Sequence, residues 1–236
     1  MGGRTAASHG KIFLLLAAAI IAQAVLTLAW PRFLASLRYL PVERAIKGYY
    51  AGGEVPSDRL PVLIRFATEA IGLQDHYRFY DGLSTLQVLR ATDYKTPALE
   101  RRPAYISAMG AAEQALLRAP ANPSTWLRLA SVRWILHEEP ETIVDAWKMS
   151  IFTGRIHTDL LARRTEIGLA YFEFLDEEGK AMLRDQLLLA WKLRPSQLMQ
   201  VSVRRDPELA LVRHLLTGVA PATLSEIEDW FEKRRR

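Results

Sequence analysis

The chain has no cysteine among its 236 residues. This absence excludes disulfide bonds, thiolate catalysis, iron–sulfur clusters and cysteine-ligated zinc. It leaves the compartment open, because both periplasmic and cytosolic domains can lack disulfides. The fold must therefore be held together by a hydrophobic core, and the hydrophobic content of 50% is ordinary for a folded protein.

The chain also lacks a strong charge imbalance. Its 31 basic and 26 acidic residues leave a formal net charge of +5. Charges mixed at this level usually lie on solvated helix faces, whereas nucleic-acid binding calls for a basic patch. We therefore expect no nucleic-acid partner.

Common catalytic and cofactor-binding motifs are missing. The sequence contains no Walker, GxSxG, dinucleotide-binding or HExxH pattern, and its five histidines have no metal-ligand spacing on a helix. His76, which lies near Tyr77 and Asp81, is interpreted as a surface or half-buried histidine. An acidic cluster falls at an expected helix boundary, where capping explains it; its members are Glu173, Asp176, Glu177 and Glu178. We predict no catalytic residue, no cofactor, no metal and no enzymatic activity.

One long apolar run is present, from Ile12 to Trp30, and it contains no charged residue. A helix of this length is about 28 Å long, close to the thickness of a bilayer's hydrocarbon core. Ala22-Gln23-Ala24 resembles the cleavage site of a signal peptide, and a buried core helix is a third reading. Because the apolar run continues to Trp30, which suits a membrane interface, we predict an uncleaved single-pass signal anchor.

The direction of the anchor is left open by the charges around it. Arg4 and Lys11 precede it, but four basic residues come after it within 31–50. The count of basic residues points the next domain into the cytoplasm. A short basic N-terminus before one apolar run is, however, the layout of an anchor that exports the domain after it. Of the two directions, we expect the one in which the domain is exported.

Residues 31–50 have apolar positions at near-helical spacing with basic residues between them. One reading is a basic amphipathic helix lying on anionic headgroups; the other is the first helix of the globular domain. The candidate membrane-surface contacts are Arg32, Arg38, Arg44 and Lys47. Gly52-Gly53 and Pro56 indicate a turn. We divide the chain into a basic N-terminus (1–11), a transmembrane helix (12–30), a juxtamembrane helix and linker (31–56) and a helical domain (57–236).

Helix signals dominate the helical domain, and no segment alternates like a half-buried strand. Asp75, Ser124 and Asp176 are expected N-caps, Pro140 is expected at the first helical position, and 96–103 is expected to be a loop. The predicted class is all-α. The expected helices cover 57–71, 75–92, 104–118, 124–137, 140–154, 158–175, 177–193, 206–217 and 221–236.

Three helix ends look alike, at 115–120, 146–150 and 190–195, with offsets typical of stacked helix-pair repeats. The region 104–217 resembles the tetratricopeptide repeat. Arg133 departs from it, standing where a tyrosine is usual, and the third helix end is displaced; an irregular helical bundle is the alternative. The resemblance implies an antiparallel helical-repeat stack packed through small and aromatic residues: Ala108, Ala115, Pro120, Trp126, Leu129, Ala130, Ala146, Trp147, Ala190 and Trp191.

A looser resemblance rests on Asn122–Ala130, Ala146–Gly154 and Leu187–Pro195 together with the anchor. This layout is similar to the VpsP-like membrane-anchored proteins of bacterial exopolysaccharide gene clusters. The resemblance implies a bacterial inner-membrane protein, whose domain we expect in the periplasm, with an accessory role in polysaccharide production or export and not a reaction. We expect a non-enzymatic scaffold whose concave helical surface binds a peptide or helix of a membrane protein.

Aromatic residues concentrate in the first half of the helical part of the chain. They suit both sugar rings and protein partners, although core packing is the simpler explanation. The alternative function is therefore a lipid- or saccharide-binding envelope module, using residues 32–47 and these aromatics: Tyr49, Tyr50, Phe66, Tyr77, Phe79, Tyr80, Tyr94 and Tyr105.

Overall fold

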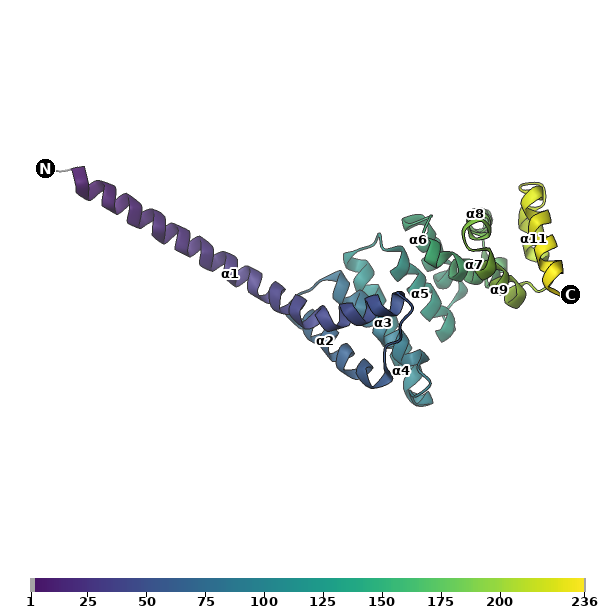
Figure 1. Cartoon of the computed structure of the whole chain (residues 1–236), viewed down its shortest axis with the longest axis horizontal. Coiled ribbons are helices and arrows are strands. Elements are labelled where there is room, and N and C mark those ends of the chain that lie inside the picture. The colour runs from purple at the N-terminus through teal and green to yellow at the C-terminus, as the bar shows by residue number, and fades with distance from the viewer. Residues whose placement is uncertain (1–2, 236) are drawn as a thin grey trace.

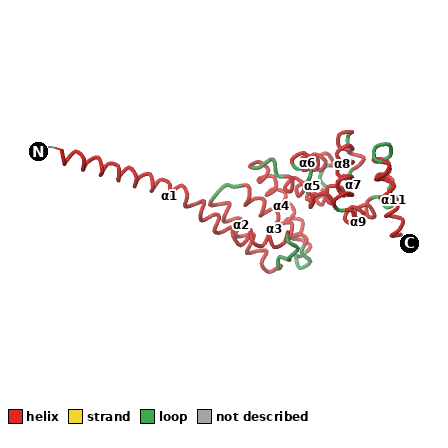
Figure 2. Tube along the Cα trace, turned by 45° about the horizontal axis from the view of Figure 1, so that its top comes forward, coloured by secondary structure: helices red, strands yellow, loops and turns green. Residues whose placement is uncertain are grey.

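The computed structural model describes the backbone of residues 3–235 and the side chains of residues 15–233. Within these residues all regular secondary structure is helical, which confirms the all-α prediction (Figures 1 and 2). The helices are α1 (Gly3–Tyr50), α2 (Leu60–Leu73), α3 (Tyr77–Thr92), α4 (Ala98–Arg118), α5 (Pro123–Leu136), α6 (Pro140–Thr153), α7 (Leu161–Ala170), α8 (Glu177–Leu193), α9 (Pro195–Arg205), α10 (Ala210–Leu216) and α11 (Pro221–Arg235), with short 3₁₀ turns at Ser57–Arg59, Thr158–Leu160 and Phe172–Phe174.

Helix α1 is one continuous helix of 48 residues. Its first part projects away from the rest of the molecule, and its last part lies against α2 and α3 (Figure 1). The described part of the projecting segment is exposed and apolar, so it is a candidate membrane span. Pro31 and Pro41 lie inside α1 without ending it. The candidate membrane span and the start of the domain therefore belong to the same helix.

The second half of α1 belongs to the core of the helical domain. Ala35, Tyr39 and Val42 are buried together with apolar residues of α2 and α3. They recur every three to four residues and so form one face of the helix. This favours the reading of residues 31–50 as the first helix of the domain, and the linker is the turn over residues 51–56.

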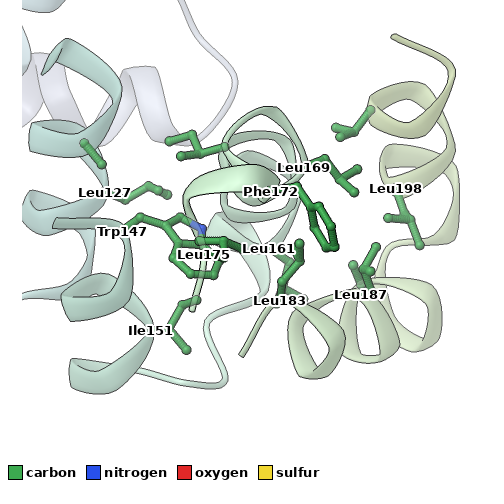
Figure 3. Close-up of a cluster of buried hydrophobic side chains, with 14 of the residues drawn as sticks. Leu127, Trp147, Ile151, Leu161, Leu169, Phe172, Leu175, Leu183, Leu187 and Leu198 are labelled. Atoms are coloured by element: carbon green, nitrogen blue, oxygen red, sulfur yellow. The ribbon is translucent and has the colours of Figure 1, made fainter. Parts of the chain in front are cut away.

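Most helices that are consecutive in sequence lie side by side. α1 packs on α2, α3 on α4, α5 on α6 and α7 on α8, while α7 also contacts α5 and α9. A second hydrophobic core, around the fully buried Trp147, is built from residues of α4 to α11 (Figure 3). The Trp147 indole nitrogen donates a 2.8 Å hydrogen bond to the Arg164 carbonyl. This order of neighbours is compatible with a repeat stack, and the tetratricopeptide-like arrangement stays a prediction.

Several predicted boundaries are wrong. Helix α5 is capped by Asn122, whose side chain accepts a hydrogen bond from the Thr125 amide, and not by Ser124. The helix expected over 158–175 is interrupted, because α7 ends at Ala170 and 3₁₀ turns lie on either side of it. The helix expected from 206 begins at Ala210.

Two further boundaries also differ from the prediction. The loop expected over 96–103 is mostly helix, because α4 begins at Ala98 and contains Pro103. Pro103 cannot bond to the carbonyl of Leu99, but Leu99 is exposed, so water can satisfy that carbonyl. Helix α3 is capped by His76, whose Nδ1 accepts a hydrogen bond from the Arg78 amide, and not by Asp75.

Helix α9 was not expected. Its start signal is Pro195 at the first helical position, but this proline was interpreted as the end of a repeat. Its buried residues are Leu198, Met199, Val201 and Ser202, the inward face of a short amphipathic helix. By contrast, Pro140 begins α6 and the Asp176 side chain caps α8, as expected.

Candidate functional site

The four candidate membrane-surface residues lie along α1 beyond Trp30. Arg38 lies 3.7 Å from Glu69, and Lys47 lies 2.9 Å from Glu43. Arg32 and Arg44 are exposed. At about 1.5 Å per residue, Arg32 stands about 3 Å beyond Trp30, but Lys47 stands about 25 Å beyond it. Arg32 is therefore the only one of the four within one helical turn of the candidate span, while Arg44 and Lys47 lie far along the part of α1 that belongs to the domain.

The ten residues predicted to pack the repeats lie at helix contacts or beside them. Ala108, Ala115, Leu129, Ala130, Ala146, Trp147 and Ala190 are buried, Trp126 and Trp191 are partly buried, and Pro120 is exposed. The Trp126 indole donates a 2.7 Å hydrogen bond to the Pro120 carbonyl. The Trp191 indole donates to Glu226 of α11. These residues hold helices together and contribute no chemical site.

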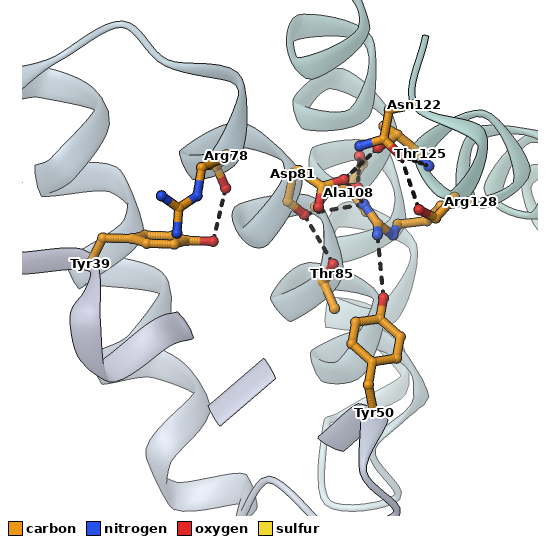
Figure 4. A network of polar contacts seen from close by, with 11 residues as sticks. Tyr39, Tyr50, Arg78, Asp81, Thr85, Ala108, Asn122, Thr125 and Arg128 are labelled. Carbon is orange, nitrogen blue, oxygen red and sulfur yellow. Dashed lines mark hydrogen bonds and ion pairs between the residues drawn. The ribbon is translucent and has the colours of Figure 1, made fainter. Parts of the chain in front are cut away.

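Tyr39 fixes α1 against α3 at the junction with the helical domain. Its ring packs on Phe79 with centroids 4.8 Å apart, and its hydroxyl donates a 2.8 Å hydrogen bond to the Arg78 carbonyl (Figure 4). Gly82 leaves room for the hydroxyl, since a β-carbon there would lie 1.9 Å from that oxygen. The contact therefore requires glycine on α3.

A polar network continues from this junction to α5 (Figure 4). Arg128 donates to the Asp81 carboxylate at 2.8 Å, to its carbonyl at 3.1 Å and to the Tyr50 hydroxyl at 3.4 Å. Thr125 donates to the same carboxylate. Burial alone would lower the pKa of Arg128. The hydrogen bonds and electrostatic attraction from Asp81 and Tyr50 outweigh this effect, so the pKa of Arg128 is raised. The network joins the end of α1 to α3 and α5.

A fully buried arginine, Arg164, lies where α6 ends. Its guanidinium donates to the Ser150 carbonyl and hydroxyl, to the Gly154 carbonyl at 2.9 Å and to the Gln186 side chain at 3.2 Å. Burial lowers the pKa of Arg164 to about 10, so it is still charged at neutral pH. A cation at the carbonyl end of a helix is favourable. Arg164 therefore closes α6 and has a structural role.

A second polar group, here called the arginine cluster, lies where α5, α7 and α9 meet. It consists of Trp134 of α5, Arg163 and Glu166 of α7, and Arg204 and Arg205 of α9. Arg163 donates to Glu166 at 2.8 Å and Arg205 does so at 3.3 Å, while Arg204 stands 3.7 Å from the same carboxylate. The guanidinium carbons of Arg163 and Arg205 each lie 4.6 Å from the centre of the Trp134 ring. The cluster has three cations and one anion.

The electrostatics of the cluster result from this excess of cations. Burial would raise the pKa of Glu166, whose side chain is 9% exposed. The hydrogen bond from Arg163 and the charges of the three arginines outweigh burial and lower that pKa. Glu166 is therefore ionised at neutral pH and holds α7 to α9.

Two grooves lie near these groups. One, of about 640 Å³, is lined by Met199, Gln200, Val203, Arg204, Pro207, Trp230 and Phe231 and runs beside α9 and α11. The other, of about 670 Å³, lies beside α1. It is lined by two arginines, two acids and apolar side chains, including Pro41, Arg44, Glu54, Asp58, Arg59 and Phe66.

The aromatic residues of the first half do not line one surface. Of the eight named above, only Phe66 borders the groove beside α1. Phe79 is buried, Tyr94 is exposed, and Tyr80 lies beneath the Arg118 guanidinium. The eight side chains therefore lie in several small groups, such as the Tyr49–Tyr50 pair, and not along one binding surface.

Two of the histidines and the central residue of the acidic cluster make structural contacts. His76 caps α3, and His214 packs edge-on against Phe172. Asp176 caps α8 and pairs with Lys148 at 2.6 Å. Among the residues the structure describes, no group of three histidine and acidic side chains could hold a metal ion.

The networks around Arg128 and Glu166 were not predicted. Arg128 lies within the repeat-like segment Asn122–Ala130, but its partner Asp81 is 47 residues earlier. In comparisons with known proteins, no family model and no curated protein matches this chain. The functional argument therefore rests on the geometry of α1, the arginine cluster and the grooves.

Proposed function

We propose that this protein is a non-enzymatic, membrane-anchored scaffold. The observation that carries the proposal is the continuity of α1, whose exposed apolar half leads without a break into the half that is buried in the domain core. Ala35, the first buried residue, lies only about 7.5 Å along the axis from Trp30. The helical domain is thus held next to the membrane surface at a fixed orientation.

A fixed orientation suits a scaffold. Anchoring raises the effective concentration of the domain near a membrane partner, and a rigid connection limits the directions in which it can be engaged. The Tyr39 and Arg128 contacts support this rigidity, because they join α1 to α3 and α5. The domain presents packed helices and charged side chains, which suit binding of a protein segment.

The pathway in this proposal is bacterial exopolysaccharide production or export, supported by the resemblance to the VpsP-like proteins. The domain would face the periplasm. Two fusions at the C-terminus test this orientation. Activity of an alkaline phosphatase fusion supports it. An inactive alkaline phosphatase fusion together with an active fusion to a reporter that works only in the cytoplasm would contradict it.

A cellular experiment tests the scaffold itself. Insertion of four glycines between Arg32 and Phe33 gives α1 a hinge and leaves every described core residue in place. Exopolysaccharide output should fall toward that of the deletion strain, while the same insertion between Gly52 and Gly53, already a turn, should have little effect. Unchanged output after deletion of the whole gene would refute the pathway.

The groove beside α1 favours one second candidate, a saccharide-binding module. Arg44 and Arg59 are balanced there by Glu54 and Asp58, so the lining carries no net charge from these groups. This balance suits a neutral sugar better than an anionic lipid, and Phe66 offers an aromatic ring. Titration of the full chain in nanodiscs with neutral oligosaccharides, with Phe66→Ala as the comparison, tests this candidate. Binding to anionic vesicles in preference to sugars would contradict it.

A further inference from the structure

Arg204 is a cation without a carboxylate of its own. Its side chain is 62% exposed, and its Nε donates a hydrogen bond to the Gln200 carbonyl one turn earlier on α9. The nearest carboxylate, Glu166, already accepts hydrogen bonds from Arg163 and Arg205. Nη2 of Arg204 stands 3.7 Å from Glu166, which is beyond hydrogen-bond distance, so Arg204 donates no hydrogen bond to a carboxylate and can pair with one on a partner.

The same arginine lines the groove between α9 and α11. The other lining residues include Met199 and Phe231, which are buried in the core, and Val203, which is 54% exposed. The groove therefore offers an apolar floor with a guanidinium at its edge. Its volume of about 640 Å³ is enough for one or two bulky side chains.

We propose that this groove binds an acidic segment of a partner protein, in which a bulky apolar side chain enters the groove and a neighbouring carboxylate pairs with Arg204. Charge complementarity carries the assignment, because the adjoining arginine cluster has three guanidiniums and one carboxylate. A guanidinium presents paired donors that match a carboxylate. The inference rests on the proposed scaffold function and specifies the chemistry of the partner that the scaffold holds.

The test uses the full chain in nanodiscs and two fluorescent peptides. The acidic probe is Asp-Glu-Leu-Phe-Asp-Glu-Leu-Leu-Glu-Asp-Leu-Glu, and the control probe replaces every Asp by Asn and every Glu by Gln. The acidic probe should bind more tightly than its amide copy, and added salt should weaken its binding. Equal binding of the two probes, or no binding of either, would overturn the proposal.

Two substitutions locate the site. Arg204→Gln should weaken binding of the acidic probe about threefold or more, a magnitude typical of a partly exposed ion pair. Arg65→Gln is the matched control, since Arg65 is 66% exposed and also stands 3.7 Å from a helical glutamate, Glu69. Val203→Asp should repel the probe, while Val219→Asp, at a valine that is 55% exposed, should not.

The remaining outcomes also decide the question. If Arg204→Gln and Arg65→Gln weaken binding equally, the attraction is a general effect of positive charge and the site is refuted. If the chain dimerises and Val203→Asp dissociates the dimer, a second copy of this chain occupies the groove and the proposal is wrong. Because these measurements are made in vitro, their failure leaves the cellular tests of the anchored scaffold intact.

Discussion

A β-carbon on Gly82 of α3 would lie 1.9 Å from the hydroxyl oxygen of Tyr39 on α1. The two helices meet so closely there that only glycine fits. Because Tyr39 belongs to the helix that carries the candidate membrane span, a change at a single glycine in the domain acts on the anchor's attachment.

Gly82→Ala should therefore lower the free energy of unfolding by about 1–3 kcal/mol, the usual cost of overpacking a core. Chemical denaturation of the full chain in detergent measures this cost. Gly110→Ala is the control, because Gly110 lies on the exposed face of α4 with nothing within 4 Å of the added carbon. That substitution should stabilise the protein by about 0.5–1 kcal/mol. Equal stability of the two variants would refute the close contact.

Truncation distinguishes an anchor that is separable from the domain from one that is part of it. A chain that starts at Pro31 keeps Ala35, Tyr39 and Val42 and should fold without a membrane. A chain that starts at Ala51 loses all three and exposes the apolar faces of α2 and α3. It should lose about 3 kcal/mol or more, which is roughly 6–12 °C in melting temperature for a domain of this size. Equal melting temperatures would place α1 outside the core.

The Glu166 carboxylate makes stability depend on pH. Since the arginines lower its pKa in the folded state, the ionised form stabilises the fold above the ordinary pKa of 4.5, and this stabilisation is lost as the pH falls toward the folded-state value. Urea midpoints between pH 7 and pH 4 should fall more for the natural chain than for Glu166→Gln. Glu173→Gln, at an exposed glutamate, should behave like the natural chain. Parallel pH profiles for the natural chain and Glu166→Gln would contradict this account.

Replacing the buried Arg164 should cost far more than replacing an exposed arginine. Arg164→Leu leaves the Ser150 and Gly154 carbonyls without their donor at the end of α6. We expect a loss of about 2–4 kcal/mol. Arg155→Gln removes an exposed pair with Asp185 and should cost less than about 1 kcal/mol. Thermal unfolding of the two variants in the same detergent gives the comparison.

Local signals in the sequence predicted the helical class and several boundaries. Pro140 and Asp176 mark helix starts through chemistry confined to one turn. Pro195 carries the same signal, but the repeat pattern gave it a competing meaning, so α9 was missed. Pro31 was interpreted as the end of the membrane segment, although a proline on an exposed helix face need not end the helix.

The candidate site could not be predicted in the same way. Arg128 and Asp81 are 47 residues apart, and Arg205 and Glu166 are 39 apart. Such pairs depend on how helices stack, which periodicity within one helix does not specify. The requirement for glycine at position 82 likewise depends on Tyr39, a residue of another helix.

The central claim is that α1 transmits a fixed orientation from the membrane to the helical domain. The cysteine-free chain allows spin labels to be placed at Thr27→Cys in the projecting part of α1 and at Glu138→Cys in the domain. Pulsed electron–electron double resonance in nanodiscs should then show one narrow distribution of the distance between the two spin labels. The distribution should broaden when four glycines are inserted between Arg32 and Phe33. The claim would be contradicted if the doubly labelled chain without the insertion gave a distance distribution as broad as that of the four-glycine variant.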